Sequence, residues 1–383
     1  MKNSRKKIWI KILICLIAFS AIELPTGFFK AKAALLLAPP DSLVMTLKVF
    51  PEGYTSICAD GNSPILLDIT LNDLNHNPVP YSMIRVSTIN FSGEVNPKYP
   101  FTDKNGRVII SIYPDGIIKP VDEPADMREI PVSVILNSKK SIPVKWDAKL
   151  SAPPVILIHG FQDSSESMIP LKNYLQENGF RVYTVDYDTN SDLETMAESL
   201  YKAICGQISD LKAEGVFAEK TDLVAHSLGG LVARYYTSRH SYIKNPNVNK
   251  IIFINVPHHG TPWAEAGAKI LNSPFLEELH PTGKLYTSIF PNAINKGLNH
   301  NIQVVNIALE NDEVIPLPSS MLNSWNIDTK IYRIGSEPLD LGSIILNPIS
   351  GGSRHRQILF FTPVFEEILH FLTNNQPYPL KRK

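Results

Sequence analysis

The stretch AHSLGG at residues 225–230 decides the fold of the larger part of this chain. It follows a predicted strand, 222–225, and precedes a predicted helix, 228–236. A serine hydroxyl becomes a useful nucleophile when a sharp strand-to-helix turn exposes it, small neighbours flank it and a base is within reach. Ala225 and Gly229 are the small residues on either side of Ser227. The pattern therefore predicts a nucleophilic serine at the start of a helix.

Strands and helices alternate around this turn. Residues 155–158 form a continuous apolar run, which is typical of a strand buried on both faces. Further strands are predicted at 181–186, 250–255, 302–308 and 330–334, and further helices at 168–178, 193–213 and 363–372. This alternation predicts a mostly parallel sheet covered by helices, and we assign it to residues 151–383.

The first part of the chain has a different pattern, and 383 residues exceed the usual size of one domain. Short runs rich in Val, Ile and Thr are separated by Pro, Gly, Asn and Asp, which predicts a β-sandwich. We assign residues 34–150 to this domain and its linker, the linker lying around 148–154. The predicted strands are 43–50, 65–71, 83–89, 107–113 and 130–136.

Residues 1–33 have the order of a secretory signal peptide: a basic start, an apolar run and then small residues. Ala31 and Ala33 fit a cleavage site, and the apolar run is shorter than a bilayer span. An uncleaved N-terminal anchor is the alternative. We expect a secreted or cell-surface protein, without a sortase-type anchor in the final residues.

The composition excludes several classes of protein. Apolar residues make up 44% of the chain, which argues against intrinsic disorder, and a formal net charge of zero gives no sign of a nucleic-acid partner. Cys58 and Cys205 fall in different predicted domains, so we expect no disulfide between them. Because no clustered Cys and His spacing occurs, we expect neither a structural metal nor a cofactor.

The predicted β-sandwich resembles a known family. The segments 58–61, 73–79 and 102–108 are similar to the bacterial Ig-like domains of invasin- and intimin-type surface proteins. In that family such domains are spacers or adhesive modules. The resemblance implies a contact with a cell surface or a lipid interface rather than chemistry.

Residues 154–372 resemble the α/β hydrolases, and among them the secreted bacterial lipases and esterases whose nucleophile turn begins with Ala. The family places an oxyanion-hole loop after the first buried strand, where this chain has His-Gly-Phe. The resemblance implies that the main-chain N–H groups of Phe161 and Leu228 form the oxyanion hole. The residues to which it gives a supporting role are His159, Gly160, Ala225 and Gly229.

The resemblance also implies the catalytic base and acid, through the family's chain order and the residue types it requires. The base must titrate near neutrality, and the family's order of Ser, acid and His requires a late histidine. His355 lies in a loop before the last helix, whereas His370 lies within that helix, so we choose His355. Asp312, followed by Val314-Ile315-Pro316, is the predicted acid. Glu310 and Glu313 are interpreted as solvated loop charges, and the long stretch 336–354 must fold back to deliver the base.

Two segments leave alternatives open. One is the segment 256–264, which reads Val-Pro-His-His-Gly-Thr-Pro-Trp-Ala. It is similar to segments that line the floor near the acyl site of many lipases. Its adjacent histidines leave a metal site as the alternative. Residues 264–301 mix apolar and polar side chains and form either a cap over an apolar cleft or ordinary packing. The apolar residues concerned are Phe275, Leu276, Leu279, Leu285, Ile289 and Phe290.

The resemblance implies a secreted serine hydrolase that cleaves carboxylic esters, a triacylglycerol lipase or a carboxylesterase, through an acyl-enzyme. The implied partner is an ester or lipid substrate. Two alternatives remain: a surface adhesin with an inactive hydrolase domain, and an acyltransferase or phospholipid deacylase that uses the same triad.

Overall fold

The computed structural model describes residues 43–117, 126–139, 141–271, 273–335 and 353–373. The predicted signal peptide at 1–33 lies outside the described residues, as does most of the stretch 336–354. Both assignments therefore stay predictions. Among the described helices, none combines the length and apolar character needed to span a membrane.

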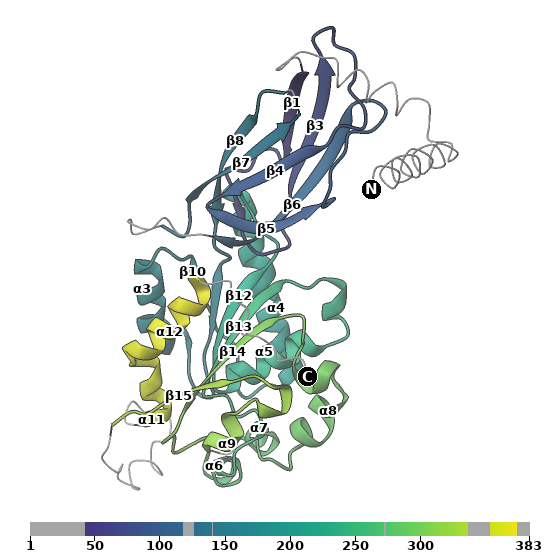
Figure 1. Ribbon diagram of the computed structural model, residues 1–383. Coiled ribbons are helices and arrows are strands. Elements are labelled where there is room, and N and C mark those ends of the chain that lie inside the picture. The colour runs from purple at the N-terminus through teal and green to yellow at the C-terminus, as the bar shows by residue number, and fades with distance from the viewer. Residues whose placement is uncertain (1–42, 118–125, 140, 272, 336–352, 374–383) are drawn as a thin grey trace, which may run out of the picture.

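The N-terminal part is mostly sheet (Figure 1). One antiparallel sheet has the order β1 (Leu43–Phe50), β3 (Ile65–Asp73), β6 (Arg107–Ile117), β5 (Phe91–Asn96), and the other joins β4 (Ile84–Ile89), β7 (Ile130–Ser138), β8 (Val144–Ser151) and β2 (Ser56–Cys58). In β3 alternate side chains are fully buried, because successive residues of a strand point to opposite faces. The five predicted strands are confirmed, whereas their Ig-like assignment stays a prediction.

The predicted linker is wrong in one respect. Residues 148–151 belong to β8, which pairs with β7 as far as Leu150 opposite Ile130. The chain thus passes from β8 to the next sheet through residues 152–154 alone. In β8 the exposed Lys145, Asp147 and Lys149 alternate with more buried apolar residues, a strand pattern that the sequence interpretation overlooked.

The second part contains a six-stranded parallel sheet of order β10-β9-β12-β13-β14-β15. Every side chain of β9 and β12 is buried, as expected for strands covered on both faces. The predicted parallel sheet is confirmed. The strands are β9 (Val155–Ile158), β10 (Val182–Val185), β12 (Thr221–His226), β13 (Val248–Ile254), β14 (Gln303–Leu309) and β15 (Thr329–Tyr332).

Helices cover both faces of this sheet (Figure 1). On one face α3 (Ile169–Glu177) and α12 (Thr362–Thr373) pack on Val155 and Leu157, and on the other α4 (Leu193–Ala213) and α5 (Leu228–Ser238) pack on Ile156 and Ile158. The shorter helical elements are η2 (Ser165–Met168), η3 (Tyr242–Lys244), α6 (Trp263–Leu271), α7 (Pro274–Glu278), the π-helical η4 (Leu285–Ile289), α8 (Phe290–Asn292), η5 (Ile294–Gly297), α9 (Leu317–Ser320), η6 (Asn323–Trp325), α11 (Arg354–Gln357) and η7 (Ile358–Phe360).

The two parts share hydrogen bonds at the amino ends of β9 and β12. Strand β11 (Val216–Phe217), which follows α4, pairs in parallel with β2 of the N-terminal part. The buried Asp60 carboxylate accepts hydrogen bonds from the main-chain N–H groups of Glu219 and Lys220, both at 3.0 Å. The N-terminal part is therefore joined by a shared sheet, at the end opposite the carboxyl ends of the parallel strands.

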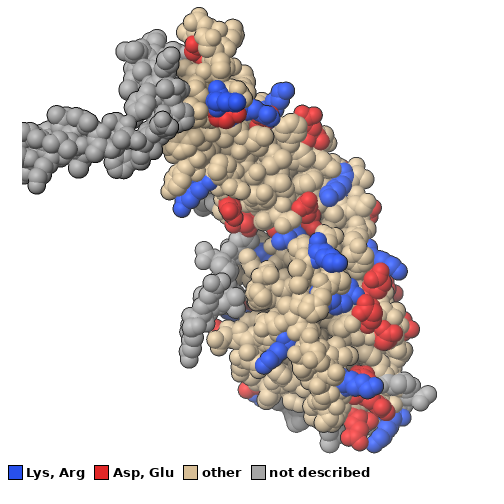
Figure 2. Space-filling view, turned by 90° about the vertical axis from the view of Figure 1, so that its right-hand side faces the viewer, with Lys and Arg blue, Asp and Glu red and all other residues tan. Residues whose placement is uncertain are grey.

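Charged side chains are spread over both parts. On the face shown in Figure 2, acidic and basic groups alternate along the molecule rather than gathering by sign. Salt bridges such as Arg107–Asp68 and Lys149–Glu129 connect opposite charges on the N-terminal strands. This distribution agrees with the balanced composition.

Candidate active site

Ser227 lies at the turn between β12 and α5 with a φ of 51° and a ψ of −123°. A positive φ is costly for a residue with a side chain, so the surrounding packing has to enforce it. A Cβ on Gly229 would lie 2.5 Å from the carbonyl oxygen of His159, and one on Gly230 would lie 2.1 Å from Cγ2 of Val256. Glycine at both positions lets the start of α5 approach the neighbouring strand ends closely.

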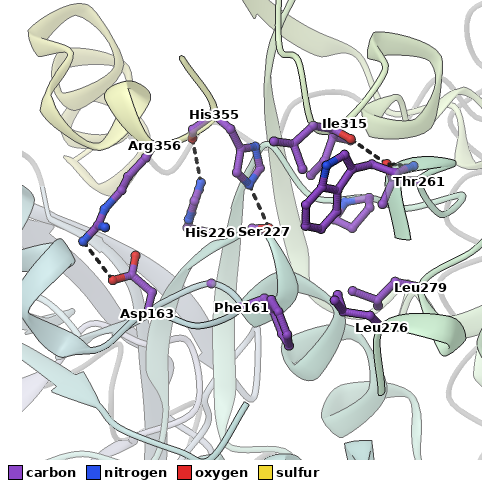
Figure 3. A pocket seen from close by; sticks show the side chains of 14 residues that line it. Phe161, Asp163, His226, Ser227, Thr261, Leu276, Leu279, Ile315, His355 and Arg356 are labelled. Carbon is purple, nitrogen blue, oxygen red and sulfur yellow. Dashed lines mark hydrogen bonds and ion pairs between the residues drawn. The ribbon is translucent and has the colours of Figure 1, made fainter. Parts of the chain in front are cut away.

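Ser227, His355 and Asp312 form a continuous hydrogen-bonded chain. Nε2 of His355 lies 3.0 Å from Oγ of Ser227, and Nδ1 of His355 lies 2.7 Å from Oδ2 of Asp312 (Figure 3 shows the first contact). Because a carboxylate only accepts, Nδ1 carries the proton and Nε2 is free to accept the serine proton. The other oxygen of Asp312 accepts hydrogen bonds from the N–H groups of Val314 and Ile315, at 2.7 and 2.8 Å, which hold the carboxylate in place.

The environment of His355 favours its charged form. Burial lowers the pKa of His355, but the nearby carboxylates of Asp312, Glu313 and Asp163 outweigh that effect and raise the pKa above its ordinary value. The imidazole can thus hold a proton taken from Ser227.

Two side chains also hold the main chain of His355. Glu313 accepts the His355 N–H at 3.5 Å, and Nε2 of His226 donates to the His355 carbonyl oxygen at 3.0 Å. The prediction of Glu313 as a solvated loop charge is wrong, because the turn that begins at Asp312 directs it toward the histidine and buries one of its oxygens. Burial lowers the pKa of His226 well below its usual range, so its ring is neutral.

The sequence interpretation assigned no role to His226. Its ring is buried, and its centroid lies 4.8 Å from that of the His355 ring. A polar residue that follows the apolar run 223–225 and directly precedes the nucleophile was the available signal. The bonding partner could not be inferred, because His355 lies 129 residues away.

The predicted oxyanion-hole residues flank Ser227. Within the described residues, no hydrogen bond occupies the main-chain N–H of Phe161 or of Leu228. A Cβ on Gly160 would lie 3.1 Å from Cβ of Ser227, so this glycine lets the loop after β9 come close to the nucleophile. Both N–H groups are thus unoccupied among the described residues and belong to segments next to Ser227, and their role as an oxyanion hole stays a prediction.

The other candidate histidines lie away from the nucleophile. His159 is buried, stacks on Tyr187 with centroids 4.4 Å apart, and contacts the Gly160 carbonyl oxygen through Nδ1 at 2.9 Å. The supporting role given to His159 stays a prediction. His370 is exposed on α12.

The segment 256–264 has two parts to its structure: its first histidine is buried in a polar network, and other residues of the segment face the region beside Ser227. His258 is buried in a network in which Nδ1 lies 3.2 Å from Nη1 of Arg234 and Nε2 lies 3.1 Å from Oδ1 of Asn306. Burial lowers the pKa of Arg234 to about 10 and also lowers that of His258. Three other residues of the string, Pro257, Thr261 and Trp263, line a cavity beside Ser227, whereas His258 and His259 do not. The described residues contain no group of three or more potential metal ligands.

A cavity opens beside Ser227, and together with the solvent at its mouth it encloses about 590 Å³. One wall is apolar, and the other carries an ion pair between Asp163 and Arg356 (Figure 3). In the segment 264–301, Leu276 and Leu279 line the cavity, whereas Leu285 and Phe290 are buried in the core. The expected ordinary packing is thus present, and a cap over the cleft stays a prediction. Ile289 departs from that expectation, being 37% exposed. The apolar wall consists of Phe161, Pro257, Trp263, Leu276, Leu279, Val314 and Ile315.

Comparisons with known proteins agree with this architecture. Residues 153–277 match the family model described as alpha/beta hydrolase fold. This part of the chain has an α/β-hydrolase fold. The chain is 27% identical over 130 residues to palmitoyl-protein thioesterase 3 of Dictyostelium discoideum, covering 33% of this chain and 42% of the relative. The chain thus spans less than half the length of that curated relative.

Solved structures show similarity at low identity. A Bacillus licheniformis lipase in its propeptide form has a TM-score of 0.44 and 17% identity, covering 58% of this chain and 50% of the lipase chain. The D00-D0 domain of intimin has a TM-score of 0.23 and 12% identity, covering 30% of this chain and 49% of the intimin chain.

Proposed function

We propose that this protein is a serine hydrolase of carboxylic esters. The observation that supports the proposal best is the hydrogen-bonded chain from Ser227 through His355 to Asp312, next to a cavity with an apolar wall. A nucleophile, a base and an orienting acid are the three groups that acyl transfer to a serine requires.

The reaction proceeds in two halves. Oγ of Ser227 attacks the acyl carbonyl carbon while its proton passes to Nε2 of His355, and the N–H groups of Phe161 and Leu228 stabilise the oxyanion. His355 then protonates the alcohol oxygen as the bond between acyl carbon and alcohol breaks. In the second half water, deprotonated by His355, attacks the acyl-enzyme and releases the acid.

The surroundings of His355 suit this sequence of steps. The carboxylates that raise its pKa stabilise the imidazolium that forms after each proton transfer. The intact chain of contacts and the open cavity disfavour the adhesin with an inactive hydrolase domain. The same geometry serves thioesters or transfer to an alcohol, so those substrates belong in the test.

The test measures the hydrolysis of p-nitrophenyl esters of increasing acyl length by the full chain. Hydrolysis of an acyl thioester and acyl transfer to added alcohols are then measured in the same way. Ser227→Ala is expected to lose at least about a thousandfold in kcat. Ser238→Ala provides a control, because Ser238 is a buried serine at the other end of α5 whose hydroxyl donates to the Tyr235 carbonyl oxygen, away from the triad. Wild-type rates in Ser227→Ala would disprove the proposal.

We further propose that the protein is exported through residues 1–33 and that its N-terminal β-domain contacts a cell surface or lipid interface. The basic and apolar order of residues 1–33 supports export. N-terminal sequencing of protein recovered from the culture medium tests cleavage after Ala33. Retention of all the protein inside the cells would contradict export.

A further inference from the structure

The N-terminal part has one end that lies opposite the hydrolase part. Strand β7 begins at Ile130, which is opposite Leu150 and next to the passage into the hydrolase part. It ends at Ser138, which is opposite Ile84 at the beginning of β4. The beginning of β4 and the end of β7 therefore lie away from the hydrolase part, at what we call the distal end.

A short antiparallel ribbon precedes β4 at the distal end. The Thr102 N–H donates to the Ser82 carbonyl oxygen at 3.0 Å. The Ile84 N–H donates to the Pro100 carbonyl oxygen at 2.9 Å. Because successive residues of such a ribbon point to opposite faces, these four residues are buried and the residues between them are exposed.

Three exposed apolar side chains share the outer face of this ribbon. Met83 and Phe101 lie directly opposite each other, and Tyr99 lies two residues before Phe101 on the same face. Their exposed fractions are 39% for Met83, 64% for Tyr99 and 52% for Phe101. We call these three residues the apolar patch. An exposed apolar group of this kind marks a surface that another molecule covers.

Three cations lie beside the apolar patch, namely Arg85, Lys98 and Lys139, here called the distal cations. Arg85 lies two residues after Met83 on the same face, and Nζ of Lys98 lies 5.8 Å from the centroid of the Tyr99 ring. Lys139 directly follows the last residue of β7, which pairs with the start of β4. All three side chains are exposed, and none forms a salt bridge with a described residue.

The carboxylate that follows the ribbon in the chain is held by its own turn. Asp103 accepts the main-chain N–H groups of Asn105 and Arg107, at 2.8 and 2.9 Å. The distal cations are thus left to pair with anions from outside the chain, and Coulomb attraction favours that pairing.

We infer that the distal end binds an anionic lipid surface: the apolar patch enters the interface, and the distal cations pair with lipid phosphates. This inference rests on the proposed contact of the N-terminal β-domain with a cell surface or lipid interface, and it names the residues and the lipid.

The composition of the distal end favours a lipid surface over a protein partner. Aromatic rings lie at the level of the head groups in membrane interfaces, and lysine and arginine attract anionic lipids. Two of the three distal cations are lysines, which are depleted in protein–protein interfaces relative to the rest of a protein surface. Long lysine and arginine stems can also lie along apolar surface while their charges reach the head groups.

Binding at the distal end leaves the active site free. Ser227 follows β12 at the carboxyl end of the parallel sheet, whereas the N-terminal part is joined at the amino ends of β9 and β12. Changes in the apolar patch should therefore leave the hydrolysis of a soluble ester unchanged. That activity serves as a control for folding.

The experiment measures the binding of residues 34–383 to sedimented vesicles. Residues 1–33 are omitted because their apolar run would itself enter a bilayer, and every described residue is kept. The vesicles consist of ether-linked phosphatidylcholine, alone or with an equal share of ether-linked phosphatidylglycerol, so that they contain no ester to hydrolyse. We expect the partition coefficient to be at least about tenfold higher on the anionic vesicles and to fall when salt is added, because each cation near an anionic surface contributes about a fivefold factor that salt screens.

Two double variants test the residues. Phe101→Ser/Arg85→Gln removes one apolar side chain and one cation of the distal end, and we expect at least about a tenfold loss of partition on the anionic vesicles. Ile109→Ser/Lys48→Gln is the matched control on the outer face of the other sheet, where Ile109 is 51% exposed and Lys48 is paired in register with Asp68. It should keep wild-type binding, and both variants should hydrolyse p-nitrophenyl butyrate at the wild-type rate.

The outcomes separate this inference from the proposed ester hydrolysis. Equal partition of the wild-type protein on neutral and anionic vesicles, no binding to either, or equal partition of the two double variants would overturn the inference and leave ester hydrolysis standing. Wild-type dimers that bind no vesicles, and that Phe101→Ser/Arg85→Gln dissociates in sedimentation velocity, would instead show that the distal end joins two copies of the chain. Vesicle binding as expected without hydrolysis of p-nitrophenyl butyrate would disprove ester hydrolysis and leave this inference standing.

Discussion

The replacement Asp60→Ala tests whether the N-terminal part stabilises the hydrolase part. Asp60 is 2% exposed, and its carboxylate accepts four main-chain N–H bonds: Asn62 at 2.8 Å, Ser63 at 2.6 Å, and Glu219 and Lys220 at 3.0 Å. The last two come from the segment between β11 and β12, so one side chain joins two regions about 160 residues apart. Removing it leaves these donors without their acceptor.

The magnitude follows from the number and kind of donors. A hydrogen bond to a charged group contributes roughly 1.5–3 kcal/mol, and a buried donor left unpaired costs about 1–3 kcal/mol. Water reaches some of the donors after the replacement, so we expect a loss of about 4 kcal/mol in the free energy of unfolding rather than the full sum. Urea unfolding followed by tryptophan fluorescence measures it.

Asp73→Ala is the matched control. Asp73 also accepts main-chain N–H bonds, from Asn75 at 2.8 Å and Asn77 at 2.9 Å, but within a single exposed turn of the N-terminal part. Its replacement should cost much less, because water can satisfy the same donors. Equal losses for the two variants, or a loss below about 1 kcal/mol for Asp60→Ala, would refute the reasoning.

Three further predictions concern the site and its support. Asp312→Asn should lower kcat/KM by about ten-thousandfold. It should also move the acid limb of the kcat/KM pH profile to lower pH, because His355 must be neutral to act and loses the carboxylate that raises its pKa. An acid limb that does not move would contradict the pairing of Asp312 with His355. Burial raises the pKa of the Asp222 carboxyl from 3.8 to about 6, so the folded protein holds this proton more tightly than the unfolded chain does. The stability that this proton contributes is present below about pH 4 and is lost as the pH rises through 6. The difference in unfolding free energy between the wild-type protein and Asp222→Asn should therefore fall over that interval and level off above pH 7, and a constant difference would show that Asp222 does not titrate there. Gly230→Ala should lower the free energy of unfolding by about 1–3 kcal/mol, because its Cβ would clash with Val256, and adding Val256→Ala should restore part of that loss. Gly206→Ala, whose Cβ would meet open space, should not destabilise the protein. Urea unfolding of these two single variants, of Val256→Ala and of the double variant Gly230→Ala/Val256→Ala measures the differences.

Local patterns were sufficient for most of the fold. The apolar run at 155–158, the helical spacing at 193–213 and the small residues around Ser227 predict their elements within a few residues of the observed bounds. Such patterns work because burial on one or both faces imposes a period of 2 or 3.6 on the side chains of a single segment. The chain order of the family that the sequence resembles, together with residue type, led to the choice of Asp312 and His355, which the structure brings into contact.

Other features depended on distant parts of the chain. Strand β11 has two residues and no period of its own, and only its pairing with β2 makes it a strand. Glu313, Asp163 and Arg356 look like ordinary surface charges in the sequence, and their roles arise because three loops meet at His355.

The sequence by itself therefore determined the parallel sheet and the nucleophile turn, and its resemblance to a family indicated which acid and base to expect. The tertiary structure alone decided how His355 is held, which wall of the cavity is polar and how firmly the two parts are joined. The physical reason is that periodicity records the burial of one segment, whereas hydrogen bonds and ion pairs between loops depend on positions that only the folded backbone brings within about 3 Å.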